Sequence, residues 1–313
     1  MVHSEKLEET ALWHIYQRKL STNEKLSSWV KEVYEAAAKY MLDVRQTFQN
    51  YTLHDATHIL NVLDAMSGLL GDQIERLTVG EMELLILSAC LHDLGMVYTE
   101  EEKRRCYQDE AACRKFLREY CPELLGCPVS EWSEDTRKWY LRTLHPFRLH
   151  EVLQNKAWKE LFDKCPSEVV PKRYIIAVCQ AHGENPTEFM HKEDLHHLAA
   201  NDAEPLFCAL LLRLSDLLDF DDTRAPGILY SYVACNEKSR AEWDKHQASA
   251  GFHYPASPSA DDLPYRARCT NPGVEHAVRD FLNWIDEELG NCIKLQKYCQ
   301  TGWQQEFLFP RAV

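Results

Sequence analysis

Apolar residues recur at spacings of three and four along most of the chain, which predicts a mainly helical protein. The first such segment is 26–48, where Ser27 or Ser28 is a suitable cap. Its apolar stripe consists of Trp29, Val33, Ala37, Tyr40, Met41, Val44 and Phe48. The segment is therefore predicted to be one amphipathic helix.

Two further helices are predicted next, and both carry ionisable side chains near an end. The first runs from about Asp55 to 70 and is stopped by Gly71. His54 and His58 are four residues apart, so they share one face at its start. The second opens at the capping-box pair 78 and 81, is strongly apolar, and ends at Gly95 just after His92 and Asp93.

The middle of the chain predicts three more helices. One begins near 135, one begins at Pro171 and ends at Gly183, and one begins at Pro205 and is apolar nearly all round. They place His145, His182 and Asp216 among apolar residues, where desolvation is expensive unless a metal or a cation compensates.

His150 competes with His145 for a place at any common centre. The two are five residues apart, about 140° around a helix, so at most one of them faces that centre. His145 is favoured because it follows Leu141 and Leu144.

The remaining segments interrupt or follow these helices. Residues 98–134 are charged and irregular and are interpreted as an insertion of helices and loop over the core. After 224, the segment 227–236 resembles a strand or short mixed element, 248–265 is a predicted loop, and 273–299 is a predicted helix. The predicted fold class is mainly α, a helical bundle with a smaller C-terminal α or α+β extension.

Composition excludes several classes. The 313 residues carry a formal net charge of -14, which argues against general nucleic-acid binding because phosphate neutralisation needs clustered cations. No apolar run reaches the roughly 18 residues of a membrane helix, and the charged N-terminus does not resemble a secretory signal. A cytoplasmic protein is expected, with its 12 scattered cysteines reduced. A small anionic substrate would need bound cations in so acidic a protein.

His58, His92, Asp93, His145, His182 and Asp216 occur in an order that resembles the HD-domain superfamily of metal-dependent phosphohydrolases. The similarity lies in HILNVL, LSACLHDLGM and LLRLSDLLD, and it covers about residues 26–224. The stretches YTLHDATHILNVL, TRAPGILY and EWDKH resemble a bacterial subgroup in which this domain is N-terminal in longer proteins. Residues 1–224 are thus the expected HD-type domain, and 225–313 an extension that covers the site and leads to any further domain.

The resemblance implies a ligand set and a reaction. His58, His92, Asp93 and Asp216 are expected to hold one divalent metal, a mixture of imidazole and carboxylate suited to Mn, Fe, Co, Ni or Zn. The site is expected to hold one or two such metals, and in the two-metal version His145 and His182, with Asp93 bridging, hold the second, where Mg is also compatible. Two such metals activate water and clamp a phosphoryl group.

The resemblance also suggests roles around the metals. Class I cyclic-nucleotide phosphodiesterases carry a histidine four residues before the first metal-binding histidine, so His54 is assigned as the general acid, with Asp93 catalytic. Arg148, Arg213, Arg224 and Lys245 are the candidate substrate-binding cations. Arg213 is equally well interpreted as the ion-pair partner of a buried carboxylate such as Asp216 or Asp219.

The predicted function is hydrolysis of a nucleotide or nucleotide-like phosphoester. The alternatives are a di-iron oxygenase with the same ligands and a non-catalytic nucleotide sensor. The substrate can be a monophosphate, a triphosphate, a cyclic dinucleotide or an alarmone, and homo-oligomerisation or a further domain is compatible. The cluster of His191, His196 and His197 is interpreted as a solvated loop, and the acidic run of Asp219, Asp221 and Asp222 as a solvated helix end.

Overall fold

The fold is mainly α, as predicted, with two short strands in the C-terminal extension. The computed structural model describes residues 3–20, 23–166, 169–189, 191–199, 202–226, 229, 237–254, 262–300, 302–303, 309–310 and 313. The helices before the extension are α1 (Ala11–Leu20), α2 (Glu24–Met41), α3 (Val44–Thr47), α4 (Ala56–Leu70), α5 (Val79–Leu91), α6 (Glu100–Gln108), α7 (Glu110–Tyr120), α8 (Glu134–Val152), α9 (Lys156–Asp163), α10 (Lys172–Ala181), α11 (Pro186–Phe189) and α12 (Pro205–Leu218). The extension contains α14 (Glu237–Ala248), β1 (Ser249–Phe252), β2 (Tyr265–Ala267) and α15 (Pro272–Gln296).

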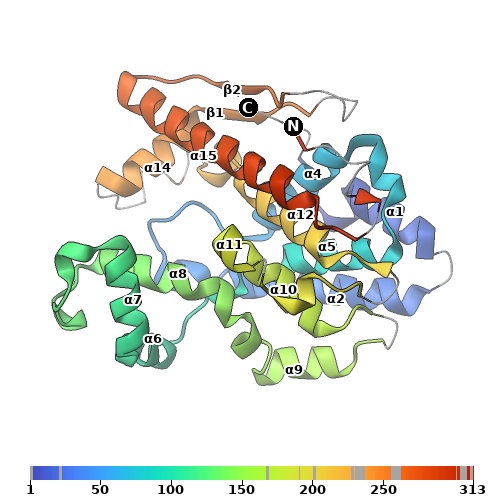
Figure 1. Cartoon of the computed structure of the whole chain (residues 1–313), viewed down its shortest axis with the longest axis horizontal. Coiled ribbons are helices and arrows are strands. Elements are labelled where there is room, and N and C mark those ends of the chain that lie inside the picture. Colours follow the sequence, from blue (N-terminus) through green and yellow to red (C-terminus); the bar gives the residue numbers. More distant parts are fainter. Residues whose placement is uncertain are drawn as a thin grey trace.

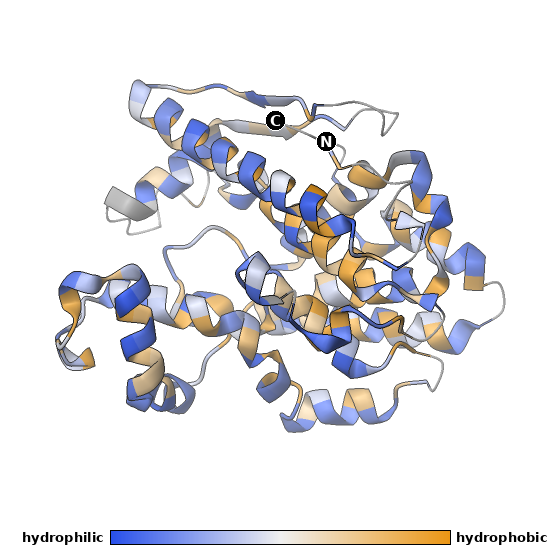
Figure 2. Cartoon of the chain, viewed as in Figure 1, coloured by the Kyte–Doolittle hydropathy of each residue, from blue (hydrophilic) through white to orange (hydrophobic). Residues whose placement is uncertain are grey.

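The centre of the body is built from α4, α5 and α12, which pack against one another. Hydrophobic residues gather in these helices, whereas the visible face of α15 is mostly hydrophilic (Figure 2). The surrounding layer consists of α1, α2, α10 and α15 (Figure 1). Among the described helices none is long and apolar enough to cross a membrane by itself; residues 79–96 meet that criterion only jointly with 100–108, at a bend of 76°.

The predicted ends of the two central helices are confirmed. Asp55 caps α4 by accepting from the Thr57 amide, and Gly71 ends it with a φ of 50° that suits glycine. Thr78 and Glu81 form the capping box that opens α5. The predicted end of α5 at Gly95 is too late, because the helix stops at Leu91 and a 3-10 turn, η3 (Leu94–Met96), follows.

The single helix predicted over 26–48 is wrong in two respects. Its cap is Asn23, whose side chain accepts from the Leu26 amide, while the Ser27 hydroxyl donates to a carbonyl inside the helix. The helix also breaks after Met41, and the break leaves Leu42 65% exposed while Val44 remains buried at the start of α3. The apolar spacing continues across the break, which is why the sequence does not reveal it.

The predicted insertion is a helical hairpin that projects from the body. Helices α6 and α7 stand beside the N-terminal half of α8, at the left of Figure 1. Phe116 of α7 packs edge-on to Tyr140 of α8, with ring centroids 5.3 Å apart, and Trp132 lies 5.8 Å from Phe116. These rings attach the hairpin to α8, the helix that carries His145.

The C-terminal extension covers one side of the body. The loop predicted over 248–265 contains strand β1, which pairs antiparallel with β2. The pairing depends on a contact that local composition does not encode, since buried Phe252 lies 5.0 Å from the Tyr265 ring. The predicted C-terminal helix is confirmed as α15 with its stripe of Val274, Val278, Phe281, Ile285 and Leu289, and nearly all of the predicted mixed element 227–236 lies outside the described residues.

Candidate metal centre

Five helices bring their ionisable residues to one point. His58 lies in the first turn of α4, His92 caps the end of α5 with Asp93 next to it, His145 lies on α8, and His182 caps the end of α10. Asp216 is in the last turn of α12. The structure thus gathers all six residues that the sequence singled out.

Four of the six form the first ligand set. The Nε2 atoms of His58 and His92 are 3.1 Å apart. Asp93 Oδ2 lies 3.3 Å from the first and 3.5 Å from the second, and Asp216 Oδ1 lies 3.3 Å and 3.7 Å from them. Ligand atoms about 2.0–2.2 Å from a shared cation are roughly 3–3.6 Å apart, so this set has the dimensions of a metal site.

The other oxygen of Asp93 belongs to a second set. Asp93 Oδ1 lies 3.1 Å from His145 Nε2 and 3.9 Å from His182 Nε2, and these two nitrogens are 2.9 Å apart. His58, His92 and Asp93 of the first set form one group able to hold a metal ion, and Asp93, His145 and His182 form the other. One carboxylate therefore faces both sets, one oxygen to each.

The ring tautomers explain why cations fit between these nitrogens. The Nδ1 atoms of His92, His145 and His182 face the carbonyls of Ala89, Arg142 and Cys179, and His58 Nδ1 lies 2.6 Å from Asp219 Oδ2. Carbonyl and carboxylate oxygens only accept, so each Nδ1 carries the hydrogen, and the Nε2 atom of each ring faces inward, where it can bind a metal once it is unprotonated. Lone pairs facing each other at about 3 Å repel unless a cation lies between them.

The charges of the cluster agree with this arrangement. Burial opposes the ionisation of Asp93 and of Asp216, but the imidazoles around them hold the pKa of both carboxyls well below the usual range. Burial and Arg224 oppose protonation of His58, yet its three carboxylate neighbours raise its pKa well above normal. Burial and the neighbouring imidazoles lower the pKa of His182 to about 3. Carboxylates here are charged, and positive charge is required among them.

Asp219 is a further residue of the cluster that the sequence did not indicate. Its interpretation as part of a solvated helix end is wrong, since Asp219 and Asp221 are both buried and only Asp222 is exposed. Asp219 accepts from His58 Nδ1 and from Asn61 Nδ2 at 2.8 Å. Its position three residues after Asp216 on an apolar helix is the signal that could have indicated it.

Because Asp219 orients His58, we expect Asp219→Ala to weaken metal binding by about 10- to 100-fold. Competition with a chromophoric chelator measures the affinity. Asp222→Ala, which removes the same charge from the exposed end of the same run, is the matched control and should bind metal normally. Equal affinities of the two variants would contradict the role given to Asp219.

His54 and Arg224 lie side by side at the edge of the centre. His54 Nδ1 donates to the Thr52 carbonyl at 2.7 Å, and its Nε2 accepts from Arg224 Nη2 at 3.1 Å and lies 3.9 Å from Asp93 Oδ2. Arg224 Nη1 donates to Asp219 Oδ2 at 2.8 Å and touches His58 Nδ1. Burial and Arg224 lower the pKa of His54 well below its usual range, so the ring is neutral in this arrangement.

Arg148 does not face the centre but fixes the helix that carries His145. Its Nη1 donates to the carbonyls of Gly95 and Val97, its Nη2 pairs with Glu102 at 2.9 Å, and its guanidinium covers the Tyr98 ring. The substrate-binding role predicted for Arg148 has no support in this geometry, because all its visible partners belong to the fold.

The same junction requires a glycine at 95. A Cβ there would lie 2.0 Å from the His145 carbonyl oxygen, a backbone atom that cannot move without α8. We expect Gly95→Ala to cost about 1–3 kcal/mol of unfolding free energy, measured by denaturant titration, and to reduce metal occupancy at His145. Gly290→Ala, where nothing lies within 4 Å of the added methyl, is the control and should be neutral or slightly stabilising.

Arg213 supports the backbone beside His182. Its Nη1 donates to the carbonyls of Ala181 and His182, both at 2.9 Å, and its guanidinium pairs with Glu288 of α15. These contacts agree better with an ion pair to a buried carboxylate than with substrate binding. The carboxylate is that of Glu288, not that of Asp216 or Asp219. Lys245 is buried, pairs with Glu242 at 2.7 Å and lies over the Phe281 ring.

A cleft of about 970 Å³ leads to the centre. Ligand residues 93, 145, 182 and 216 line it, as do His54, Arg213, Arg224 and Lys245. His58 and His92 lie beneath its floor, fully buried. Side chains of the α6–α7 hairpin and of the extension form parts of its wall, so the cleft is enclosed by elements added to the central helices.

The remaining histidines considered in the sequence lie outside the centre. His150, also on α8, is exposed. Of the cluster at 191–197, His191 and His197 are exposed and His196 is half-buried. None of the cysteines within the described segments forms a disulfide.

Comparison with known families assigns the chain. No curated protein and no solved structure shows significant similarity to it. The family model named HD-CE, an HD-type domain family, matches residues 48–291, which include all six residues of the cluster and most of the extension. The match covers more than half of the chain, and the residues it spans build the cluster described above. The protein therefore belongs to the HD-CE family.

Proposed function

We propose that this protein is a metal-dependent phosphohydrolase that cleaves a phosphoester of a nucleotide or nucleotide-like substrate. Its family and its cluster support a metal-dependent hydrolase at the family level. The observation that carries the proposal is the position of Asp93, with Oδ2 in the first ligand set and Oδ1 in the second. A shared carboxylate is the arrangement that holds two cations close together.

The protein residues divide the work around that carboxylate. Two divalent cations at these sets would supply an activated water and a clamp for phosphoryl oxygens. His58, His92 and Asp216 complete one set, and His145 and His182 the other. Asp219 fixes the tautomer of His58, so that its Nε2 stays available to a metal.

Cations of the protein suit an anionic substrate. Arg224 lies at the floor of the cleft beside Asp93, and Arg142 and Lys245 line its walls. The protein has a formal net charge of -14, which repels anions at long range. These side chains and the bound metals would provide the positive charge that attracts phosphate to the cleft.

His54 is the proposed proton donor to the leaving oxygen. In hydrolysis the water oxygen bonds to phosphorus, the bond from phosphorus to the ester oxygen breaks, and that oxygen takes a proton. Nε2 of His54 currently accepts from Arg224, so it must gain a proton first. A phosphate that draws Arg224 away would remove the main nearby cation and raise the pKa of His54.

The test is metal analysis combined with a hydrolysis panel. We expect two metal equivalents per chain after loading, and phosphoester turnover with one or more of Mn, Mg, Zn, Fe, Co and Ni. Iron-dependent oxygen consumption without phosphate release would instead indicate an oxygenase, and nucleotide binding that raises the melting temperature without turnover would indicate a sensor.

A further inference from the structure

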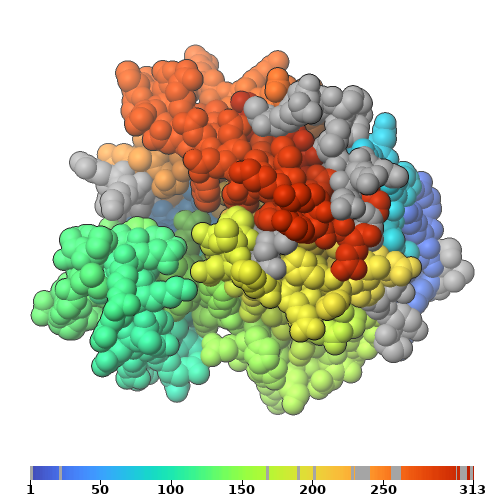
Figure 3. Space-filling view, viewed as in Figure 1, coloured from blue at the N-terminus to red at the C-terminus, as the bar shows by residue number. Residues whose placement is uncertain are grey.

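The cleft has an exposed aromatic side chain on each of two facing walls. Trp139 of α8 is 38% exposed and Tyr120 of α7 is 41% exposed, and Trp284 of α15 is 48% exposed. All three line the same cleft as the metal-facing carboxylates. In Figure 3 the surface is hollowed between the green atoms of α7 and the orange and red atoms of α14 and α15. Trp139 contacts Tyr120 of α7 and so belongs to the α7 side of the hollow, whereas Trp284 of α15 belongs to the other side.

Neighbouring rings hold both tryptophans in place. Trp139 lies 5.6 Å from Phe116, edge to face, and 5.3 Å from Tyr120. Trp284 lies 5.4 Å from Phe281 at 84°. These neighbouring rings restrict the rotamers of the two tryptophans, while one part of each ring stays exposed to the cleft. Stacking on a flat ligand would therefore cost little side-chain entropy.

The metal centre lies at the floor between these walls. A phosphodiester carries one substituent on each side of its phosphorus, so a phosphate held at the floor directs one substituent toward each wall. The cleft volume of about 970 Å³ is at the upper end of the range of roughly 300–1,000 Å³ typical of ligand pockets. Both features fit a substrate larger than a single nucleotide.

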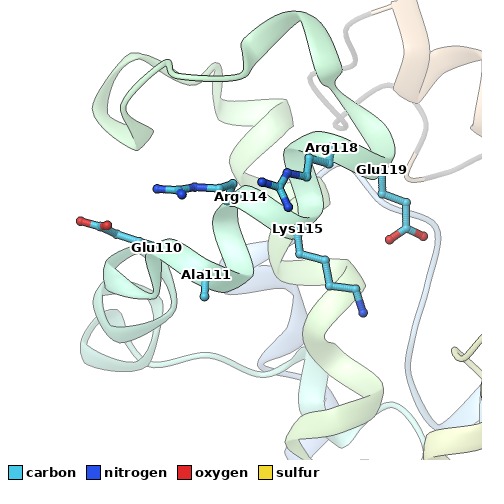
Figure 4. A pocket seen from close by; sticks show the side chains of 6 residues that line it. All are labelled: Glu110, Ala111, Arg114, Lys115, Arg118 and Glu119. Atoms are coloured by element: carbon cyan, nitrogen blue, oxygen red, sulfur yellow. The ribbon is translucent and has the colours of Figure 1, made fainter.

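Carboxylates on the rim limit how many phosphates the substrate carries. Glu119, Glu188, Glu242 and Asp280 line the cleft along with its cations. Figure 4 shows Lys115 and Glu119 extending from α7 on the opposite side from Glu110 and Arg114, so acid and base alternate on this wall. The phosphates of a long polyanion would be repelled by these carboxylates, and the polyanion would gain little binding free energy from counterion release. A short substrate whose charge lies at the metals would avoid that repulsion.

We propose that the substrate is a dinucleotide phosphodiester, with one base stacked on Trp139 and the other on Trp284. The inference rests on the proposed hydrolase function and specifies its substrate. Hydrolysis breaks the central phosphorus–oxygen ester bond with water as the only co-reactant, and it yields one nucleoside and one nucleotide. Because every base has a flat face, stacking of this kind selects for two bases and not for their sequence.

The test compares two substrates across five variants of the metal-loaded full chain. The substrates are a linear 3′,5′-linked dinucleotide and the methyl ester of a nucleoside monophosphate, which has one base. Trp139→Ala and Trp284→Ala should each raise KM for the dinucleotide by roughly 5- to 100-fold with kcat largely kept. Phe at either position should restore most of the affinity, and Tyr298→Ala, an aromatic 52% exposed and absent from the cleft lining, should change nothing.

The one-base substrate provides the decisive comparison. Only one of the two tryptophans should matter for it, and its KM should exceed that of the dinucleotide. Equal KM values for both substrates, or a dinucleotide KM unaffected by either alanine, would overturn the proposal. Calorimetric binding of the dinucleotide to the same variants keeps the test valid without turnover: loss of binding in both alanine variants supports the stacking sites even if the hydrolase function fails, and unchanged binding refutes them.

Discussion

Replacing Asp93 by alanine is expected to remove both metals and reduce turnover below detection. Asp93 is the one described carboxylate whose two oxygens face different ligand sets, at 3.3 Å from His58 Nε2 and 3.1 Å from His145 Nε2. Removal takes one ligand from each set together with the negative charge that offsets the charge of the cations. Metal content by inductively coupled plasma analysis and activity in the hydrolysis panel measure the two effects.

A more conservative variant separates charge from packing. Asp93→Asn keeps the shape but loses the negative charge, so it should also bind metal poorly while unfolding at a similar temperature. Asp72→Ala, on the exposed surface, should retain both metals and full activity. An Asp93→Ala protein that is folded and still holds two metals would refute the shared-ligand geometry.

Replacing His54 by alanine is expected to preserve the metals and lower kcat by about 10²- to 10⁴-fold, the usual contribution of a general acid. His54 donates to the Thr52 carbonyl and is not a member of either ligand set, which is why metal content should stay unchanged. The loss should be large for a substrate with an alkoxide leaving group and small for a nitrophenyl ester, whose leaving oxygen needs no proton.

The dependence on the leaving group distinguishes proton donation from a positioning role through Arg224. If His54 only positions Arg224, both classes of substrate should slow equally. His150→Ala provides the control, since that histidine is exposed on the same helix as His145. Full activity of His54→Ala toward the alkoxide substrate would exclude His54 from the mechanism.

The central helices and the six clustered residues could be predicted because local signals agree with the fold there. Asp55 and Gly71 delimit α4, and the capping box opens α5, so the sequence places His58 and His92 at known points of helices. Ionisable residues in such apolar segments need partners, so their positions in the sequence already indicate a common site.

Partners distant in sequence could not be predicted. Glu288 pairs with Arg213 across 75 residues, and Asp219 meets His58 across 161, and neither pairing leaves a periodic trace. Arg148 has a side chain suited to binding phosphate, but its guanidinium donates hydrogen bonds to the backbone carbonyls of Gly95 and Val97. Only folding brings these groups together. The break between α2 and α3 after Met41 could not be predicted either, because the apolar spacing in the sequence is the same on both sides of it.

The contacts of Arg213 connect events at the two ends of the cleft. One guanidinium holds the carbonyls of Ala181 and His182 and, through Glu288, the helix that carries Trp284. A ligand that shifts α15 therefore acts on the residue that presents its imidazole to the second ligand set. If such a ligand changes the affinity of that set for a metal, thermodynamic reciprocity requires the metal to change the affinity of the Trp284 wall by the same factor. That coupling would make substrate and metal each other's effectors, with Arg213 as one of the links between α15 and His182.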